Sequence, residues 1–280
     1  MLTRSLIHLV SSSIYLNCVK NKPIYIQLNI KYHLTVFYIL VSLALNLKGQ
    51  DIKFRHLSTS DGLSHVSVLT LYMDENHHIW IGTREGLNRY DGLNIESYKL
   101  QENNPRSLFS NNIQKITGDK QGKLYILSTE GISKYDIAKD EFSILWEDND
   151  IKSFYYSDNL YIGRGKSIYL YNEEKNEFSQ AYTLPIEASS ISSLFIDNKN
   201  GQIYAGTNIG LYVINKDNSI EYKIKTDSPI SDIYKDDDND IWISSWDDGV
   251  FRLSGNQITQ LTHHTNDKNS IASNFVRSCY

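Results

Sequence analysis

The stretch VLTLYMDENHHIWIGTREGLNRYDGLNIESY, residues 68–98, decides the fold because the chain repeats it. Similar copies occupy residues 113–144, 191–222 and 230–259, and a more divergent copy starts at residue 151. Four copies have an aspartate at the first turn: Asp74, Asp119, Asp197 and Asp236. Successive aspartates are 45, 78 and 39 residues apart, and the spacing of 78 corresponds to two periods because it spans the divergent copy. A unit that recurs in register at this spacing must bury its apolar face against neighbouring copies.

Each copy encodes short strands. Runs rich in Ile, Val, Tyr and Trp alternate apolar and polar residues, which is the period of half-buried strands. In the first copy this pattern predicts strands at residues 66–73, 79–82, 87–90 and 95–99, joined by turns of Asp, Asn and Gly. Radial repetition of such four-stranded antiparallel sheets is a β-propeller. We predict an all-β chain whose five full repeats lie near residues 66–100, 112–146, 151–182, 191–225 and 230–262.

Two sets of equivalent residues favour structural roles. Glycines recur where the second strand turns into the third, where a positive φ is expected: Gly86, Gly131, Gly210 and Gly249. Aromatic residues share one position of the second strand and are expected in the core between sheets: Trp80, Tyr125, Tyr204 and Trp242.

The two ends of the repeat region are incomplete units. The segment from Ile52 matches the fourth strand and linker of a copy, so we predict an N-terminal outer strand there. The segment from His263 matches a linker followed by the opening of a first strand, which predicts an incomplete C-terminal blade. On this count the ring does not close, and residues 51–280 are expected to be a partial propeller, a fragment of a longer protein.

Residues 1–50 differ in composition from the rest. They contain five Lys and Arg and no acid, whereas residues 51–280 contain 23 basic and 33 acidic residues. An apolar run at residues 34–45 is too short for a typical membrane span and is typical of a secretory signal, with cleavage expected near Gly49 and an uncleaved anchor as the alternative. We therefore expect an exported, periplasmic protein of a Gram-negative bacterium. The acidic balance of residues 51–280 disfavours nucleic acid as a partner, and contact with the membrane is expected only through the leader or a transmembrane part outside these residues.

The phrases DENHHIWIGTREGLNRYD and DKQGKLYILSTEGISKYD resemble the two-component regulator propeller repeat, and the resemblance covers residues 52–280. The sequence FRHLSTSDGLSHVSV, behind the signal-like run, is similar to the start of the periplasmic sensor region in hybrid two-component systems of Bacteroidetes-type bacteria. The resemblance implies seven-bladed propellers, usually two in tandem, followed by an immunoglobulin-like domain, a transmembrane helix and a histidine kinase. It also implies sensing of oligosaccharides released from polysaccharides. The 280 residues include no kinase and no second propeller, so these would be partner portions of the same protein.

No catalytic or metal-binding pattern is evident. The pairs His77 with His78 and His263 with His264 are adjacent on extended backbone and point to opposite sides, so one metal ion cannot readily use both. Residues 236–240, DDDND, lack the glycine and distant glutamate of an EF-hand and are expected to form a solvated turn. We predict no cofactor and no metal.

If a ligand binds, the geometry of the predicted sheets favours the face with the variable loops, which are the second-to-third turns and the linkers between copies. There Trp246 could stack on a sugar while Asp247 and Asp248 accept hydrogen bonds from its hydroxyls. Further candidates on this face are Arg84, Glu85 and Arg106.

Three functions stay open. The leading hypothesis is a non-catalytic extracytoplasmic sensor. The alternatives are a protein-interaction propeller, or a propeller glycosidase or lyase, although no pair of strand-borne acids for glycoside hydrolysis is apparent.

Overall fold

The computed structural model describes residues 15–16, 24–25, 37–38 and 54–279. Near the N-terminus, β1 (Tyr15–Leu16) pairs antiparallel with β2 (Ile24–Tyr25). Most of the predicted leader, including residues 34–36 and 39–45 of its apolar run, lies outside the described residues, so the leader stays a prediction. Among the described residues, no helix has the length and apolar character needed to cross a membrane.

Residues 57–279 contain a short 3₁₀ helix, η1 (Thr59–Asp61), and five four-stranded antiparallel sheets, which confirm the predicted blade. We number the blades in chain order. Blade 1 comprises β3 (Val68–Met73), β4 (Ile79–Thr83), β5 (Gly86–Tyr90) and β6 (Ile95–Tyr98). Blade 2 comprises β7 (Ile113–Gly118), β8 (Lys123–Ser128), β9 (Gly131–Asp136) and β10 (Glu141–Glu147). Blade 3 comprises β11 (Ile151–Tyr156), β12 (Leu160–Arg164), β13 (Ser167–Asn172) and β14 (Glu177–Thr183). Blade 4 comprises β15 (Ile191–Asp197), β16 (Gln202–Thr207), β17 (Gly210–Ile214) and β18 (Ile220–Lys225). Blade 5 comprises β19 (Ile230–Lys235), β20 (Ile241–Ser245), β21 (Val250–Ser254) and β22 (Gln257–Leu261).

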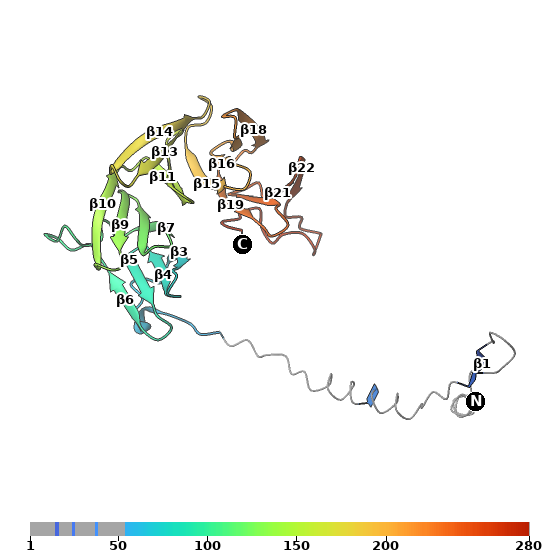
Figure 1. The fold of residues 1–280 in the computed structure, drawn as a ribbon, viewed down its shortest axis with the longest axis horizontal. Helices are drawn as coiled ribbons and strands as arrows, with labels where there is room; N and C mark the ends of the chain where they lie inside the picture. The colour runs from blue at the N-terminus through green and yellow to red at the C-terminus, as the bar shows by residue number, and fades with distance from the viewer. Residues whose placement is uncertain (1–14, 17–23, 26–36, 39–53, 280) are drawn as a thin grey trace. The chain divides into compact units, whose positions relative to one another are not determined.

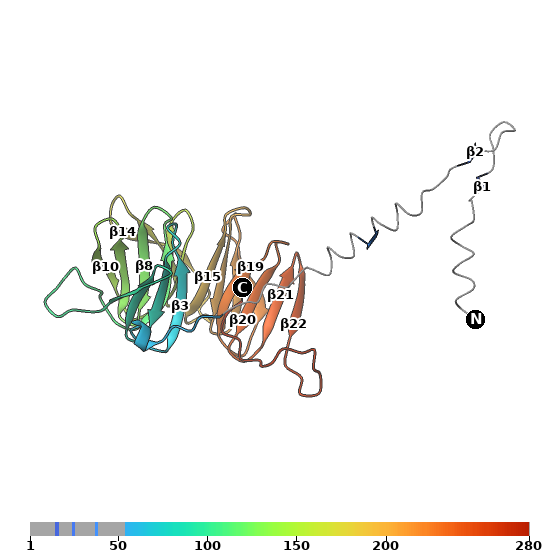
Figure 2. The same ribbon diagram turned by 90° about the horizontal axis from the view of Figure 1, so that it is seen from below.

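The blades follow one another around an arc, with the first strand of each blade innermost (Figure 1). Successive inner strands contact one another, β3 with β7, β7 with β11, β11 with β15 and β15 with β19. Seen from the side, the strands run between two faces that carry the turns (Figure 2). We call the face with the β3–β4 turn and its equivalents the first-turn face, and the opposite one the linker face.

The hydrophobic core is divided among the four junctions between blades. At the junction of blades 1 and 2, Trp80 and Leu87 pack against Ile116, Leu124 and other residues of blade 2. The other three junctions hold equivalent clusters. Trp80, Tyr125 and Tyr204 are buried, so the predicted interblade role of the repeated aromatics is confirmed for these three. Their burial follows from stacking, because each covers its neighbour's inner strand.

The repeated glycines have the expected backbone. Gly131 has φ +144°, and a Cβ there would stand 2.1 Å from the carbonyl oxygen of Trp146. A hydroxyl side chain fixes the same turn in four blades by donating to the carbonyl of the glycine; the donors are Thr83, Ser128, Thr207 and Ser245. The glycines are therefore turn residues, as predicted.

The predicted N-terminal outer strand is not formed in the described residues. Residues 54–58 have no strand pairing, because such a strand needs the third strand of its own sheet beside it. At the other end, Val276 takes the place of the first residue of another inner strand. Its carbonyl accepts a hydrogen bond from Ser231 at 2.6 Å, as the carbonyl of Ile230 accepts one from Ser192 at 2.6 Å.

Candidate ligand-binding groove

Two adjoining cavities lie where the inner strands end at the first-turn face. The first, of about 580 Å³, lies among residues from β3, from the ends of β7 and β11 and from the turns that follow these two strands. The second, of about 410 Å³, lies among the ends of β11, β15 and β19. Tyr155, Ser157 and Asn198 line both cavities. We call the two together the inner groove.

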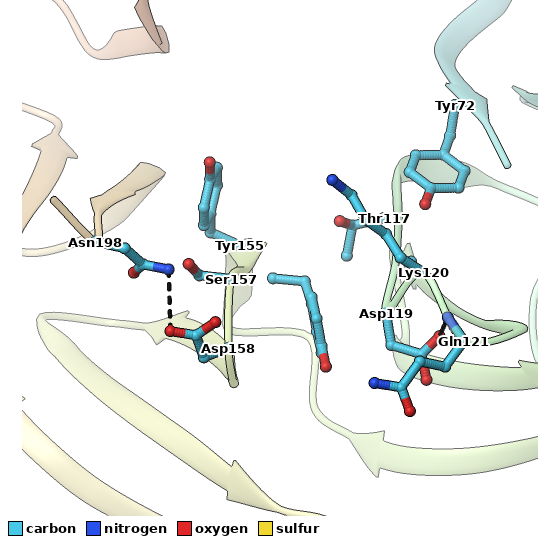
Figure 3. Close-up of a pocket in the computed structure, with 11 residues that line it drawn as sticks. Tyr72, Thr117, Asp119, Lys120, Gln121, Tyr155, Ser157, Asp158 and Asn198 are labelled. Carbon is cyan, nitrogen blue, oxygen red and sulfur yellow. Dashed lines mark hydrogen bonds between the residues drawn. The ribbon is translucent and has the colours of Figure 1, made fainter. Parts of the chain in front are cut away.

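Tyrosines supply much of the wall of the first cavity. Tyr72 and Lys120 stand on one side of it, and Tyr155, Ser157 and Asn198 stand on the other (Figure 3). Tyr155 and Tyr156 are consecutive at the end of β11, so their rings take opposite sides of the strand. Tyr156 stacks on Tyr125 with ring centroids 5.6 Å apart, and Tyr155 meets Phe195 edge-on at 5.5 Å. These aromatic neighbours hold the rings in place.

A glycine makes room for Tyr72. A Cβ on Gly118 would stand 2.4 Å from the hydroxyl oxygen of Tyr72. The φ of Gly118 lies outside the left-handed region, so the residue serves the close approach of the ring rather than a turn.

The hydroxyls of Tyr72, Tyr155 and Tyr156 have no hydrogen-bond partner in the part of the chain that the structure describes. By contrast, the hydroxyls of Tyr135 and Tyr171 donate to Asp140 and Asn176. Partly buried hydroxyls normally find partners, so three unpaired ones beside a cavity mark donors available to a bound molecule.

These hydroxyls stay protonated at neutral pH. Burial, reinforced by the charges of Glu75, Asp74 and Asp119, raises the pKa of Tyr72 to about 12. Burial also raises the pKa of Tyr155 and of Tyr156. The groove therefore presents neutral phenols that can both donate and accept hydrogen bonds.

Acceptors line the same space. Asp158 accepts a hydrogen bond from the Asn198 amide at 3.1 Å (Figure 3). Asp119 uses Oδ1 to accept the backbone N–H groups of Gln121 and Lys123, which fixes its turn. Carboxylates beside phenols can accept hydrogen bonds from hydroxyls of a polar ligand.

A buried ion pair joins blades 4 and 5 at the second cavity. The Nζ of Lys235 lies 2.7 Å from Oδ2 of Asp197, and both side chains are largely buried. Burial acts to raise the pKa of Asp197, but the hydrogen bond from Lys235, the backbone N–H of Lys199 and the Lys235 charge outweigh it and lower the pKa. The pair holds one wall of the groove in place.

The remaining turn aspartates are structural. Asp236 accepts the backbone N–H of Asp240 and the indole N–H of Trp242, so part of the predicted DDDND turn is bonded internally. No group of three or more His, Cys, Asp or Glu side chains among the described residues is placed to hold a metal ion.

The residues that the sequence pointed to lie elsewhere. Trp246 is 42% exposed on the linker face and meets Phe275 edge-on at 5.0 Å. Asp247 is exposed, whereas Asp248 accepts two hydrogen bonds from Ser228 and fixes the neighbouring linker. This turn lines none of the cavities described here.

The basic and acidic candidates of the first two blades are also separate from the groove. Arg84 and Glu85 are exposed at the β4–β5 turn of blade 1, far along the arc from the β20–β21 turn of blade 5 (Figure 1). Arg106 pairs with Glu141 at 2.7 Å and lines a cavity of about 220 Å³ under its linker. The structure does not bring the six candidates together into one site.

The linker face has a cavity of its own. It has a volume of about 620 Å³ and lies at the outer side of blade 4, where the rings of Tyr212 and Tyr222 stack at 4.6 Å. The hydroxyl of Tyr222 is already bonded to the carbonyl of Ile209, and Pro185 adds an apolar wall. Three charged side chains, Glu187, Lys225 and Asp227, also line this cavity.

One sequence signal could have found the inner groove. The residue two positions before the first turn is aromatic in four of the five copies: Tyr72, Tyr155, Phe195 and Tyr234. Three of these line the two cavities, and Tyr234 is exposed at the end of the arc.

Comparison with known proteins supports the repeat assignment. The sequence model of the family described as "Two component regulator propeller" matches residues 62–85 and 225–247. These two segments lie in the first and last of the five repeats and are similar to two-component regulator propeller repeats. Histidine kinase P4 of Formosa agariphila is 31% identical over 77 residues, which is 28% of this chain and 5% of that relative.

Solved structures share the fold. The extracellular domain of the putative one component system BT4673 from B. thetaiotaomicron has a TM-score of 0.58 at 16% identity, covering 76% of this chain and 36% of that one. The extracellular domain of the putative hybrid two component system BT3049 from the same organism has a TM-score of 0.51 at 19% identity, covering 80% and 38%. A streptogramin B lyase has a TM-score of 0.57 at 17% identity, covering 70% of each chain. The chain thus spans little more than a third of the two extracellular domains.

Proposed function

We propose that this chain is the ligand-sensing propeller of an exported two-component-type sensor, and that it binds an oligosaccharide in the inner groove without transforming it. The three unpaired tyrosine hydroxyls beside Asp119 and Asp158 carry this proposal. Sugars present apolar ring faces that stack on aromatic rings, together with hydroxyls that pair with phenols and carboxylates.

The signalling output belongs to other parts of the system. The proposal places a kinase portion and further propeller units in the same longer protein or its partner, in keeping with the kinase that matches over 5% of its length. Export to the periplasm is part of the same proposal, and the extracellular domains that share the fold support it.

Calorimetric titration of the full chain with an oligosaccharide panel tests this function. Heat of binding without new reducing ends is expected, and release of products would favour the lyase or glycosidase alternative. Tyr155→Phe removes one groove hydroxyl and should weaken binding, whereas Tyr169→Phe, whose hydroxyl is bonded to Gln180 outside the groove, should not. Failure of every glycan to bind would leave the protein-interaction alternative.

The same titration separates the two faces. If the linker face carries the site through Trp246, Asp247 and Asp248, with Arg84, Glu85 and Arg106 as further contacts, Trp246→Ala will abolish binding and Tyr155→Phe will not.

A further inference from the structure

The inner groove takes its lining residues from all five blades. Its two cavities meet at Tyr155, Ser157 and Asn198, so a molecule lying over Tyr155 has open space on both sides. The free volumes of about 580 and 410 Å³ are too large to be filled by a single sugar ring, since pockets for drug-sized ligands begin at about 300 Å³. The shape therefore suits a chain of units rather than a monosaccharide.

The lining has a negative balance in each cavity. The first has the carboxylates of Asp119 and Asp158 against the ammonium group of Lys120. The second has three carboxylates, Asp197, Asp236 and Asp237, against two lysines, Lys199 and Lys235. Lys235 is already committed to Asp197 at 2.7 Å.

The two remaining lysines count for less than the acids. Lys120 and Lys199 are exposed at turn tips, where water and salt screen their charges, whereas Asp119 is 8% exposed. The pKa shifts of two lining tyrosines agree with a negative electrostatic potential in the groove. After burial, the charges that raise the pKa of Tyr72 and of Tyr156 are all those of neighbouring acids, and Asp119 contributes to both. An anionic group of a ligand would lose its hydration shell on entering the groove and would then be repelled by these carboxylates.

We infer that the inner groove accepts an uncharged oligosaccharide of at least two sugar units, stacked over Tyr155 and reaching into both cavities, and that it rejects uronic-acid and sulfated chains. This inference rests on the proposed function. Phenols and carboxylates recognise the sugar hydroxyls, and the surplus of carboxylates sets the specificity by repelling anions.

Titration of the full chain with matched glycan pairs tests the inference. The neutral probes are malto-, cello-, xylo- and mannooligosaccharides of one to four units, and the acidic probes are oligogalacturonates and chondroitin sulfate disaccharides. We expect at least one neutral series to bind, with its dimer or trimer at least about tenfold tighter than its monosaccharide. The second sugar unit adds contacts, whereas the translational and rotational freedom of the ligand is lost only once. Tighter binding of an acidic probe than of every neutral one would overturn the inference while leaving the proposed function standing. Binding of no glycan would instead refute the proposed function.

A charge reversal gives a second, independent measurement. Asp158 is exposed, so Asp158→Lys should fold normally and turn the first cavity to a positive balance. The variant should bind oligogalacturonate measurably when the unaltered chain does not. Unchanged rejection of that probe by a folded variant would contradict the electrostatic basis of the specificity.

Discussion

The indole Nε1 of Trp80 donates a hydrogen bond to Oδ2 of Asp74 at 2.9 Å, which ties the second strand of blade 1 to the turn before it. Blade 5 repeats the arrangement, with Trp242 donating to Asp236 at 2.7 Å. An arginine lies over each indole, Arg89 at 5.9 Å from the ring centroid of Trp80 and Arg252 at 5.5 Å from that of Trp242. Both tryptophans and both aspartates fall inside the two segments that match the family.

The two tryptophans differ in burial, and their substitution should therefore differ in cost. Trp80 is fully buried under blade 2, whereas Trp242 is partly exposed. Trp80→Ala should reduce the free energy of unfolding by about 3–5 kcal/mol, and Trp242→Ala should cost clearly less. Chemical unfolding of the full chain followed by far-UV circular dichroism measures both. Equal losses of unfolding free energy in the two variants would show that the packing of blade 2 over Trp80 does not contribute to stability.

The close approach at Gly118 should control the groove. Gly118→Ala places a Cβ where the Tyr72 hydroxyl now lies and should push that ring out of its position. We expect weaker oligosaccharide binding with only a modest change in unfolding free energy, because the displaced atom is the end of a side chain that can rotate. Gly92→Ala, at an outer turn away from the groove, is the control for affinity only, because Gly92 has φ +98° and an alanine there is expected to strain the turn. If Gly118→Ala binds the oligosaccharide with unaltered affinity, Tyr72 does not contact the ligand.

The ion pair between Asp197 and Lys235 predicts a pH dependence. The pKa of Asp197 is lower in the folded chain than the value of about 3.9 for an unfolded aspartate. Its contribution to stability is therefore fully present above about pH 4 and is lost as the pH falls through the folded pKa. Asp197→Asn should be less stable than the unaltered chain at pH 7, and the difference should shrink as the pH drops below 4. A difference that stays constant down to pH 2 would contradict this assignment.

The open side of blade 1 should promote association. Leu71 and Met73 are 59% and 62% exposed, although the residues equivalent to Leu71 in the other blades are buried at the junctions: Ile116, Phe154, Leu194 and Ile233. Contiguous apolar surface of this kind drives self-association. Leu71→Lys should lower the sedimentation coefficient of the concentrated full chain, whereas Leu93→Lys, at an isolated exposed turn position, should leave it unchanged. Equal behaviour of the two variants would count against an interface at Leu71.

The blade could be predicted from the sequence because its determinants are local. Asp74 and its equivalents set the first turn, Gly86 and its equivalents set the second, and alternation sets the strands between them. The bulge at the second residue of each inner strand, such as Leu69 between Val68 and Thr70, could not be predicted, because it breaks the alternation that was used to read the strand.

The inner groove could not be predicted from the sequence for a different reason. Its walls come from residues of different blades, such as Tyr72 and Tyr155, and their meeting depends on the packing of neighbouring sheets. Loop variability pointed instead to Trp246, which lies in an exposed turn and lines neither cavity of the inner groove.

Hydrogen–deuterium exchange of the full chain with and without a bound neutral oligosaccharide tests the location of the site most directly. We predict slower exchange at residues 118–122, 155–159 and 197–199, which surround the inner groove. Protection confined to residues 83–86, 105–107 and 245–249 on the linker face would contradict it.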